Sequence, residues 1–119
     1  MQGLFFGCHN LPSIDLSSFN TSNVVTMIAL FGDCNSLTSI DVSKFDTRKV
    51  KSMNNMFQNC ISLKSIDLSN INTDNVEDMF ALFYRCEELE FVNISSFNTS
   101  KITSMVSFFY NCNPLTSID

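Results

Sequence analysis

The feature that most constrains this chain is a 26-residue period, which its cysteines mark most clearly. Cysteine recurs at every twenty-sixth position, at Cys8, Cys34, Cys60, Cys86 and Cys112. Leucine, isoleucine, phenylalanine, threonine and methionine positions follow the same step. A fixed period of this length is typical of repeat proteins, whose units bury their apolar faces only by stacking on neighbours. We expect one array over 1–119, with units at about 9–34, 35–60, 61–86 and 87–112 and partial units at both ends.

The first half of each unit carries the pattern of a strand. Apolar and polar side chains alternate around Ile40 and Val42, which predicts a short strand buried on one face. The equivalent segments predict strands at 11–16, 37–42, 63–68 and 89–94.

The second half carries the pattern of a helix. Val50, Met53, Phe57 and Cys60 are spaced by three or four residues, which is typical of one helix face. Thr47 precedes them at the position of an N-cap, where its hydroxyl would accept from a free backbone amide. The equivalent segments predict helices at 22–32, 48–58, 74–84 and 100–110.

One strand and one helix per unit predict an α/β repeat solenoid that is leucine-rich-repeat-like, with parallel strands on one face and short helices on the other. The sequence accommodates about four and a half coils. It begins within an expected helix and ends at Asp119 within an expected strand, so we expect a fragment of a longer array. The exposed apolar end coils leave end-to-end self-association open.

Composition excludes some partners. The net charge of −5 argues against nucleic acid, whose phosphates require a basic face. No run of about 18 apolar residues exists, so we expect no membrane span in this segment.

No catalytic or metal-ligating set emerges, and we expect no cofactor. Zinc sites usually bring cysteines together as Cys-x2–4-Cys pairs, and this chain has none. The cysteines are instead expected to form a buried column of free thiols that pack as small apolar side chains. His9 is the only histidine, and its equivalents Asn35 and Asn113 cannot act as bases, so we do not expect a catalytic role.

Asp15, Asp41 and Asp67 would stack on the open face of the sheet, and two interpretations remain open. Hard cations favour carboxylate oxygens, so the column is a candidate calcium or cationic-ligand strip. Alternatively, neighbouring serine hydroxyls such as those of Ser39 and Ser43 donate to the carboxylates and relieve their mutual repulsion.

Phe91 stands where the other units have serine, and it is either a binding anchor or drift in a single repeat. With its neighbours it defines a candidate partner-binding face on the strands, made of Ser39, Asp41, Ser65, Asp67, Phe91 and Asn93.

Basic residues gather in the second unit. Positive charge at a helix start opposes the helix dipole, so helix stability does not explain them. Arg48 is in phase with Asp74, and Lys51 is in phase with Glu77. We therefore predict ion pairs between neighbouring coils, each contributing up to about 1 kcal/mol.

The units SLTSIDVSKFDTRKVKSMNNMFQNC and SLKSIDLSNINTDNVEDMFALFYRC resemble the repeats of BspA-like leucine-rich-repeat surface proteins of bacteria. Ile71 and Asn93 depart from the pattern of that family, which has Phe and Asp there. The resemblance implies a cell-surface or extracellular protein often linked to adhesion, whose signal and anchor are not in this segment, and it carries over no catalytic residues.

Two functions follow as expectations. The first is a non-enzymatic surface or secreted protein that binds a protein or host-cell-surface ligand. The second is an intracellular scaffold for protein–protein interaction, which free cysteines would suit. A secretion signal in the flanking sequence would favour the first.

Overall fold

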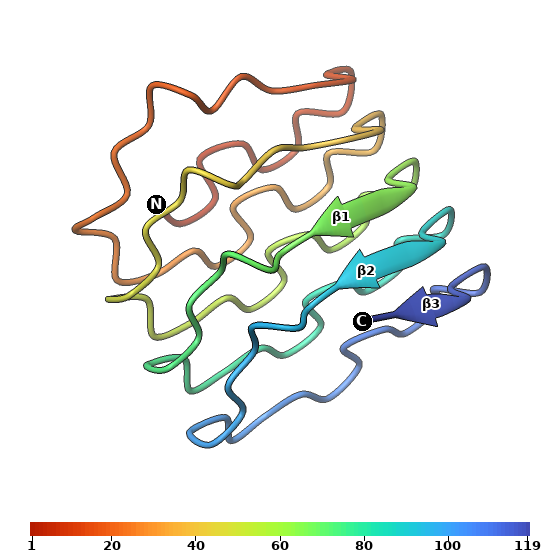
Figure 1. Cartoon of the computed structure of the whole chain (residues 1–119). Coiled ribbons are helices and arrows are strands. Elements are labelled where there is room, and N and C mark those ends of the chain that lie inside the picture. The colour runs from red at the N-terminus through yellow and green to blue at the C-terminus, as the bar shows by residue number, and fades with distance from the viewer.

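Successive 26-residue lengths of chain lie side by side in the computed structural model, which describes residues 1–119 (Figure 1). Backbone amides of one length donate to carbonyls of the next, as from Met53 to Asp78 at 3.0 Å and from Phe57 to Leu82 at 3.0 Å. Only 3 of the 57 backbone hydrogen bonds lie within regular strands. Turns and bonds between neighbouring units therefore hold most of the backbone.

The regular secondary structure is a single small parallel sheet. It contains β1 (Ser65–Asp67), β2 (Phe91–Asn93) and β3 (Ser117–Ile118), in that order. β1 and β2 lie within the strands expected at 63–68 and 89–94, although both are shorter. The segments 11–16 and 37–42 are extended but form no strand. A second line of isolated parallel bridges joins Thr26, Ser52, Asp78 and Ser104.

The predicted fold class is wrong, because the chain contains no helix. The α/β solenoid with short helices at 22–32, 48–58, 74–84 and 100–110 is therefore not the fold. Correspondingly, no helix is present that could cross a membrane.

Consecutive tight turns occupy the place of the expected helices. We call residues 27–34, 53–60, 79–86 and 105–112 the turn segments. Within 53–60, the amides of Met56, Gln58 and Cys60 each donate to the carbonyl three residues back. The amides between them point to the next unit, as from Asn59 to Tyr84 at 2.7 Å. A helix would turn every amide toward its own chain, so this alternation is what ties the units together.

Left-handed backbone at two positions of each turn segment prevents a helix. Asn55 (φ 57°) and Asn59 (φ 56°) occupy these positions in the second unit, and Gly3 and Gly7 occupy them in the first partial unit. Glycine and asparagine adopt positive φ more readily than other residues. A right-handed helix cannot pass through such residues, whatever the spacing of its apolar side chains.

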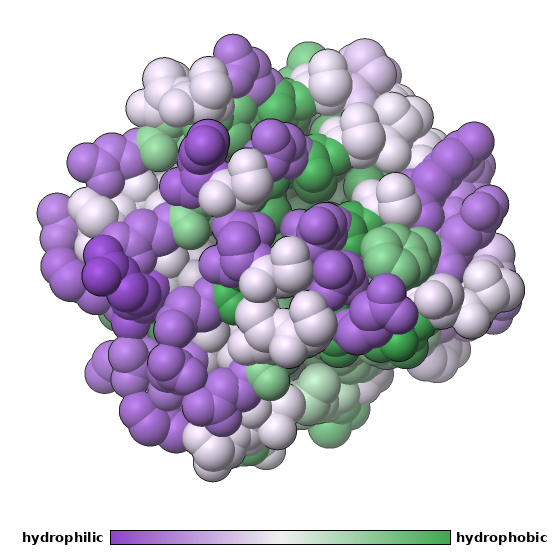
Figure 2. Space-filling model, in the orientation of Figure 1, coloured by the Kyte–Doolittle hydropathy of each residue, from purple (hydrophilic) through white to green (hydrophobic).

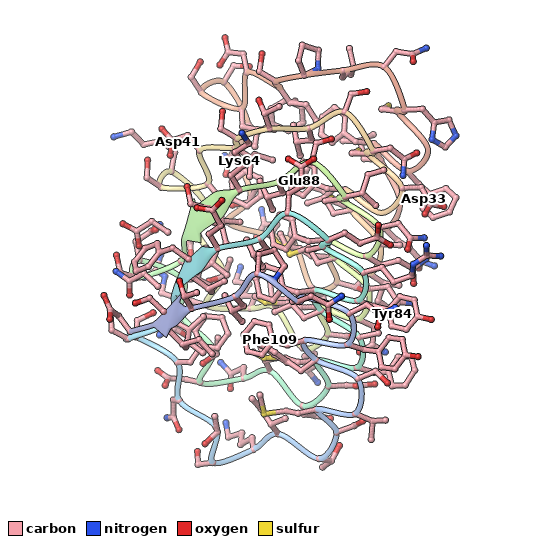
Figure 3. All side chains as sticks on the ribbon, turned by 90° about the vertical axis from the view of Figure 1, so that its right-hand side faces the viewer. Asp33, Asp41, Lys64, Tyr84, Glu88 and Phe109 are labelled. Carbon is pink, nitrogen blue, oxygen red and sulfur yellow. The ribbon has the colours of Figure 1, made fainter.

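The core lies between the sheet and the turn segments and consists of columns of identical or similar apolar side chains. One column stacks its phenylalanine rings with centroids 5.4 to 5.5 Å apart, and its members are Phe5, Phe31, Phe57, Phe83 and Phe109. Leucine, methionine and valine columns fill the remaining interior. Figure 3 shows Phe109 inside the stack, away from both outer faces. Each added unit thus buries apolar surface of the unit before it.

A buried threonine column replaces the expected N-caps. The Thr47 hydroxyl donates to the carbonyl of Asn72 at 2.9 Å and accepts from the amide of Asn72 at 2.9 Å. Thr21 and Thr73 make the same pair of bonds to the unit that follows. The hydroxyl therefore links neighbouring units instead of capping a helix.

Candidate partner-binding face

Parallel register brings four of the six candidate residues into adjacent pairs. Ser65 lies opposite Phe91, and Asp67 lies opposite Asn93. On the far side of Phe91, the register places Ser117. The aromatic ring is thus flanked by serine on both neighbouring strands, and it is half-buried.

The other two candidates, Ser39 and Asp41, belong to the extended segment beside β1. The amide of Lys64 reaches the carbonyl of Thr38 at 3.5 Å, and both Ser39 and Asp41 are exposed. Figure 3 shows Asp41 on the same side of the molecule as the strands. Seen from this side, hydrophilic side chains cover much of the surface, with apolar patches between them (Figure 2).

Each carboxylate of the Asp column is held by its own unit. Asp41 Oδ1 accepts from the amide of Ser43 at 2.8 Å, and Asp67 Oδ1 accepts from that of Ser69 at 2.9 Å. Hydrogen bonds from these serines hold the pKa of Asp41 and Asp67 below the usual value. Asp15 is bonded to Ser17 and shifted in the same direction. The carboxylates therefore close the turn that follows each strand segment, through the serine amides as well as through the expected hydroxyls.

A shallow hollow of about 140 Å³ lies beside this column between the first two units. It combines two carboxylates and one ammonium group with apolar side chains, and its lining is Ile14, Asp15, Leu16, Ser17, Asp41 and Lys44. No group of three or more His, Cys, Asp or Glu side chains is placed to hold a metal ion.

The cysteines form a column of free thiols, as expected. Four are buried, and only Cys8 is partly exposed. The Cys60 thiol donates to the carbonyl of Phe31 at 3.2 Å, and Cys34 bonds in the same way to Phe5. Burial raises the pKa of Cys34 to about 11 and raises that of Cys60 further. A thiol that stays protonated is a poor nucleophile.

His9 lies at the exposed first coil, where its Nδ1 is 2.6 Å from Oδ1 of Asn35 in the next unit. Asn35 therefore orients the imidazole. The thiol of the adjacent Cys8 makes no hydrogen bond to the ring.

The predicted ion pairs between coils are wrong. Arg48 instead forms a pair with Asp46 of its own unit at 2.6 Å. Its charge-assisted hydrogen bonds lower the pKa of Asp46 to about 2. The only other salt bridge joins Arg85 to Glu87. Arg48 turns to its own unit, whereas other side chains in phase do meet across units, as those of Lys49 and Asn23 do at 2.7 Å.

Sequence reasoning missed an apolar surface on the turn segments. Phe80, Tyr84, Val106 and Tyr110 point outward on the third and fourth turn segments, and we call them the outer turn face. Figure 3 shows Tyr84 on the side of the molecule opposite the strands. Two of the equivalent residues in the second unit are the polar Asn54 and Gln58. This departure from the repeat could have revealed the surface, but the expected helix offered a different explanation for apolar residues there.

The stacked 26-residue units and their shared side-chain columns define a repeat protein. The chain belongs to the family described as Mycoplasma protein of unknown function, DUF285, whose model matches residues 1–118. Comparison with curated proteins and with solved structures gives no match.

Proposed function

We propose that this chain is a non-enzymatic repeat protein, displayed on a cell surface or secreted, that binds a protein or host-cell ligand through its strand face. The resemblance of its units to BspA-like leucine-rich-repeat surface proteins supports this assignment. The raised pKa values of Cys34 and Cys60 disfavour nucleophilic catalysis by these thiols and support a binding role.

The observation that carries the proposal is the placement of Phe91 in the sheet. Its ring stands between Ser65 and Ser117 in the neighbouring strands, beside the pair formed by Asp67 and Asn93. Phe91 is absent from the apolar core, so its ring is available for a partner. Aromatic side chains surrounded by small polar residues are frequent anchors in protein interfaces.

Replacing the anchor tests this assignment. Beads coated with the chain are expected to adhere to cultured animal cells, and Phe91→Ala is expected to weaken this adhesion. Loss of a buried aromatic anchor typically costs at least about 2 kcal/mol, or roughly thirtyfold in affinity. The fold should persist, because Phe91 lies outside the core.

Lys49→Ala provides the matched control. Lys49 is exposed at the corner between the strand segment and the turn segment, where it donates to Asn23 at 2.7 Å. We expect this variant to adhere like the unaltered chain. Weaker adhesion of Lys49→Ala together with full adhesion of Phe91→Ala would show that the strand face is not the binding surface.

The five free thiols favour a second candidate function, an intracellular scaffold for one protein partner. Unpaired cysteines are commoner in reducing compartments than outside the cell. Protease treatment of intact cells separates the two, since a surface protein is digested and an intracellular scaffold is protected.

A further inference from the structure

The outer turn face carries the largest outward-facing side chains of the turn segments, and they are confined to two neighbouring units. Phe80 is 42% exposed, Tyr110 is 52% exposed and Val106 is 63% exposed. Figure 3 places Tyr84 at the edge of the molecule farthest from the sheet. The core does not need these side chains, because Leu82 and Phe83 already fill the interior of the same segment.

Contacts within the protein hold the side chains and backbone of the outer turn face in place. The rings of Tyr84 and Tyr110 stack with centroids 5.0 Å apart and planes 8° apart. The amide of Phe80 is held by Asp78 Oδ1 at 3.0 Å and by Asn54 Oδ1 at 3.1 Å. Ala81 donates to the carbonyl of Val106 at 2.9 Å, which fixes the two halves of the patch side by side. A preformed surface binds with little loss of conformational entropy.

Acidic residues adjoin this apolar surface in the sequence. Glu77 and Asp78 precede Phe80, and Glu87 and Glu88 follow Tyr84 closely. Residues 74–90 contain six carboxylates and only one basic residue, Arg85. Of these carboxylates only Glu87 forms a salt bridge. The excess of carboxylates over basic side chains in this stretch favours a positively charged partner.

We propose that the outer turn face binds a cationic, amphipathic peptide segment of a partner protein. Apolar side chains of that segment pack on Phe80 and Val106. Its Lys or Arg side chains lie near Glu77 and Glu88, and their aliphatic stems pack along the edges of the stacked tyrosine rings. This surface lies opposite the strand face, so the inference goes beyond the proposed function and does not depend on it.

The test uses the full chain and three short fluorescent peptides. One is an amphipathic Lys/Leu peptide, and the other two are its Glu/Leu and Lys/Ser counterparts. Fluorescence anisotropy is expected to show binding of the Lys/Leu peptide that weakens with salt. The Glu/Leu and Lys/Ser peptides are expected to bind at least about tenfold more weakly, since each lacks one of the two required features.

Variants of the chain localise the binding. Tyr84→Ser combined with Tyr110→Ser should weaken binding of the Lys/Leu peptide by about tenfold or more. If the double variant fails to fold, Val106→Ser replaces it in the test, because it changes a single exposed side chain. Glu77→Gln combined with Glu88→Gln should weaken binding severalfold and reduce its salt dependence.

Phe91→Ala is the matched control on the opposite face and should bind the Lys/Leu peptide unchanged. Equal binding of the Lys/Ser peptide would reduce the interaction to charge alone and overturn the proposal. Peptide binding that Phe91→Ala reduces and Val106→Ser leaves intact would move the site to the strand face and also overturn it. Loss of cell adhesion in Phe91→Ala with retained peptide binding would leave both proposals standing.

Discussion

A few polar side chains link each unit to its neighbour at repeated positions within a mainly apolar interface. The Thr47 hydroxyl both donates and accepts across one interface, and the Cys60 thiol donates across another. A buried hydroxyl or thiol without a partner would destabilise the fold. The partner is always a backbone group of the adjacent unit. These hydrogen bonds can therefore form between any two stacked units.

The thiol column predicts strongly unequal reactivity. In the native chain Cys8 should react with iodoacetamide first, while the buried Cys34, Cys60, Cys86 and Cys112 are protected. In denaturant all five should react. Counting modified thiols by mass spectrometry checks this, and two stable disulfides in the native protein would contradict it.

The same column predicts a loss of stability in alkali. Burial raises the pKa of Cys34 from its ordinary value of 9.0 to about 11, so the folded state favours the neutral thiol. This contribution to the free energy of unfolding is complete below pH 9 and is lost as the pH rises through about 11. Urea unfolding across that range should show the decline, and Cys34→Ala should flatten part of it.

Sequence period alone predicted which side chains are buried, because residues in phase occupy equivalent places. It could not predict their hydrogen-bond partners. Arg48 was assigned to Asp74 because the two are in phase, yet it pairs with Asp46 two residues away. The phase of a residue in the repeat fixes its position within the unit. Its bonding partner depends instead on the local path of the backbone.

The turn segments are the element that distinguishes this chain. Each turn segment contains two residues with a left-handed backbone conformation, four positions apart, such as Ala81 (φ 53°) and Arg85 (φ 58°). Neither is a residue that favours this conformation, so the bonds to the adjacent unit impose it. Some local strain is therefore offset by contacts between units.

Ser107 offers a test, because a helix and a turn segment predict opposite signs for the difference in stability between its glycine and alanine variants. It has a φ of 59°, so Ser107→Gly should be more stable than Ser107→Ala by about 0.5–1 kcal/mol. In the helix first expected at 100–110, alanine would instead be favoured by about 1 kcal/mol. Urea unfolding of the two variants decides between the signs.

The spacing of apolar residues could not reveal the turn segments. Met53, Met56 and Phe57 face the core at intervals of three and four residues, and both a helix and consecutive tight turns produce such intervals. The spacing of apolar residues indicates which side chains face the core, but it does not indicate which backbone path connects them. The distinguishing signal was the pair of turn-forming residues at Asn55 and Asn59, with glycine at the equivalent Gly3 and Gly7. The strand pattern was partly right: β1 and β2 are shorter than predicted but lie within 63–68 and 89–94, whereas 11–16 and 37–42 form no strand.

At the scale of the molecule, the columns predict which changes in length are tolerated. Deletion of 61–86 removes one whole unit and joins Cys60 to Glu87, so every column stays in phase. We expect this variant to fold cooperatively with a lower free energy of unfolding, because one interface between units is lost. Circular dichroism and urea unfolding measure both properties.

Deletion of 61–85 is the matched control. It removes one residue fewer and shifts every later column by one position. Such a slip turns the inward side chains of a strand outward, so we expect no cooperative transition. Equal stability of the two deletions would contradict the importance of the columns.

The phenylalanine column also has a meaning for the gene. Since each ring stacks on an identical ring above and below it, this column accepts a further unit at any position along the stack. Misaligned recombination between equivalent codons of two units therefore yields a reading frame longer or shorter by whole units, and the product needs no compensating substitution. Selection can then act on the outward residues of a duplicated unit, such as those at the positions of Phe91 and Tyr84. The core residues of the duplicated unit are copied unchanged.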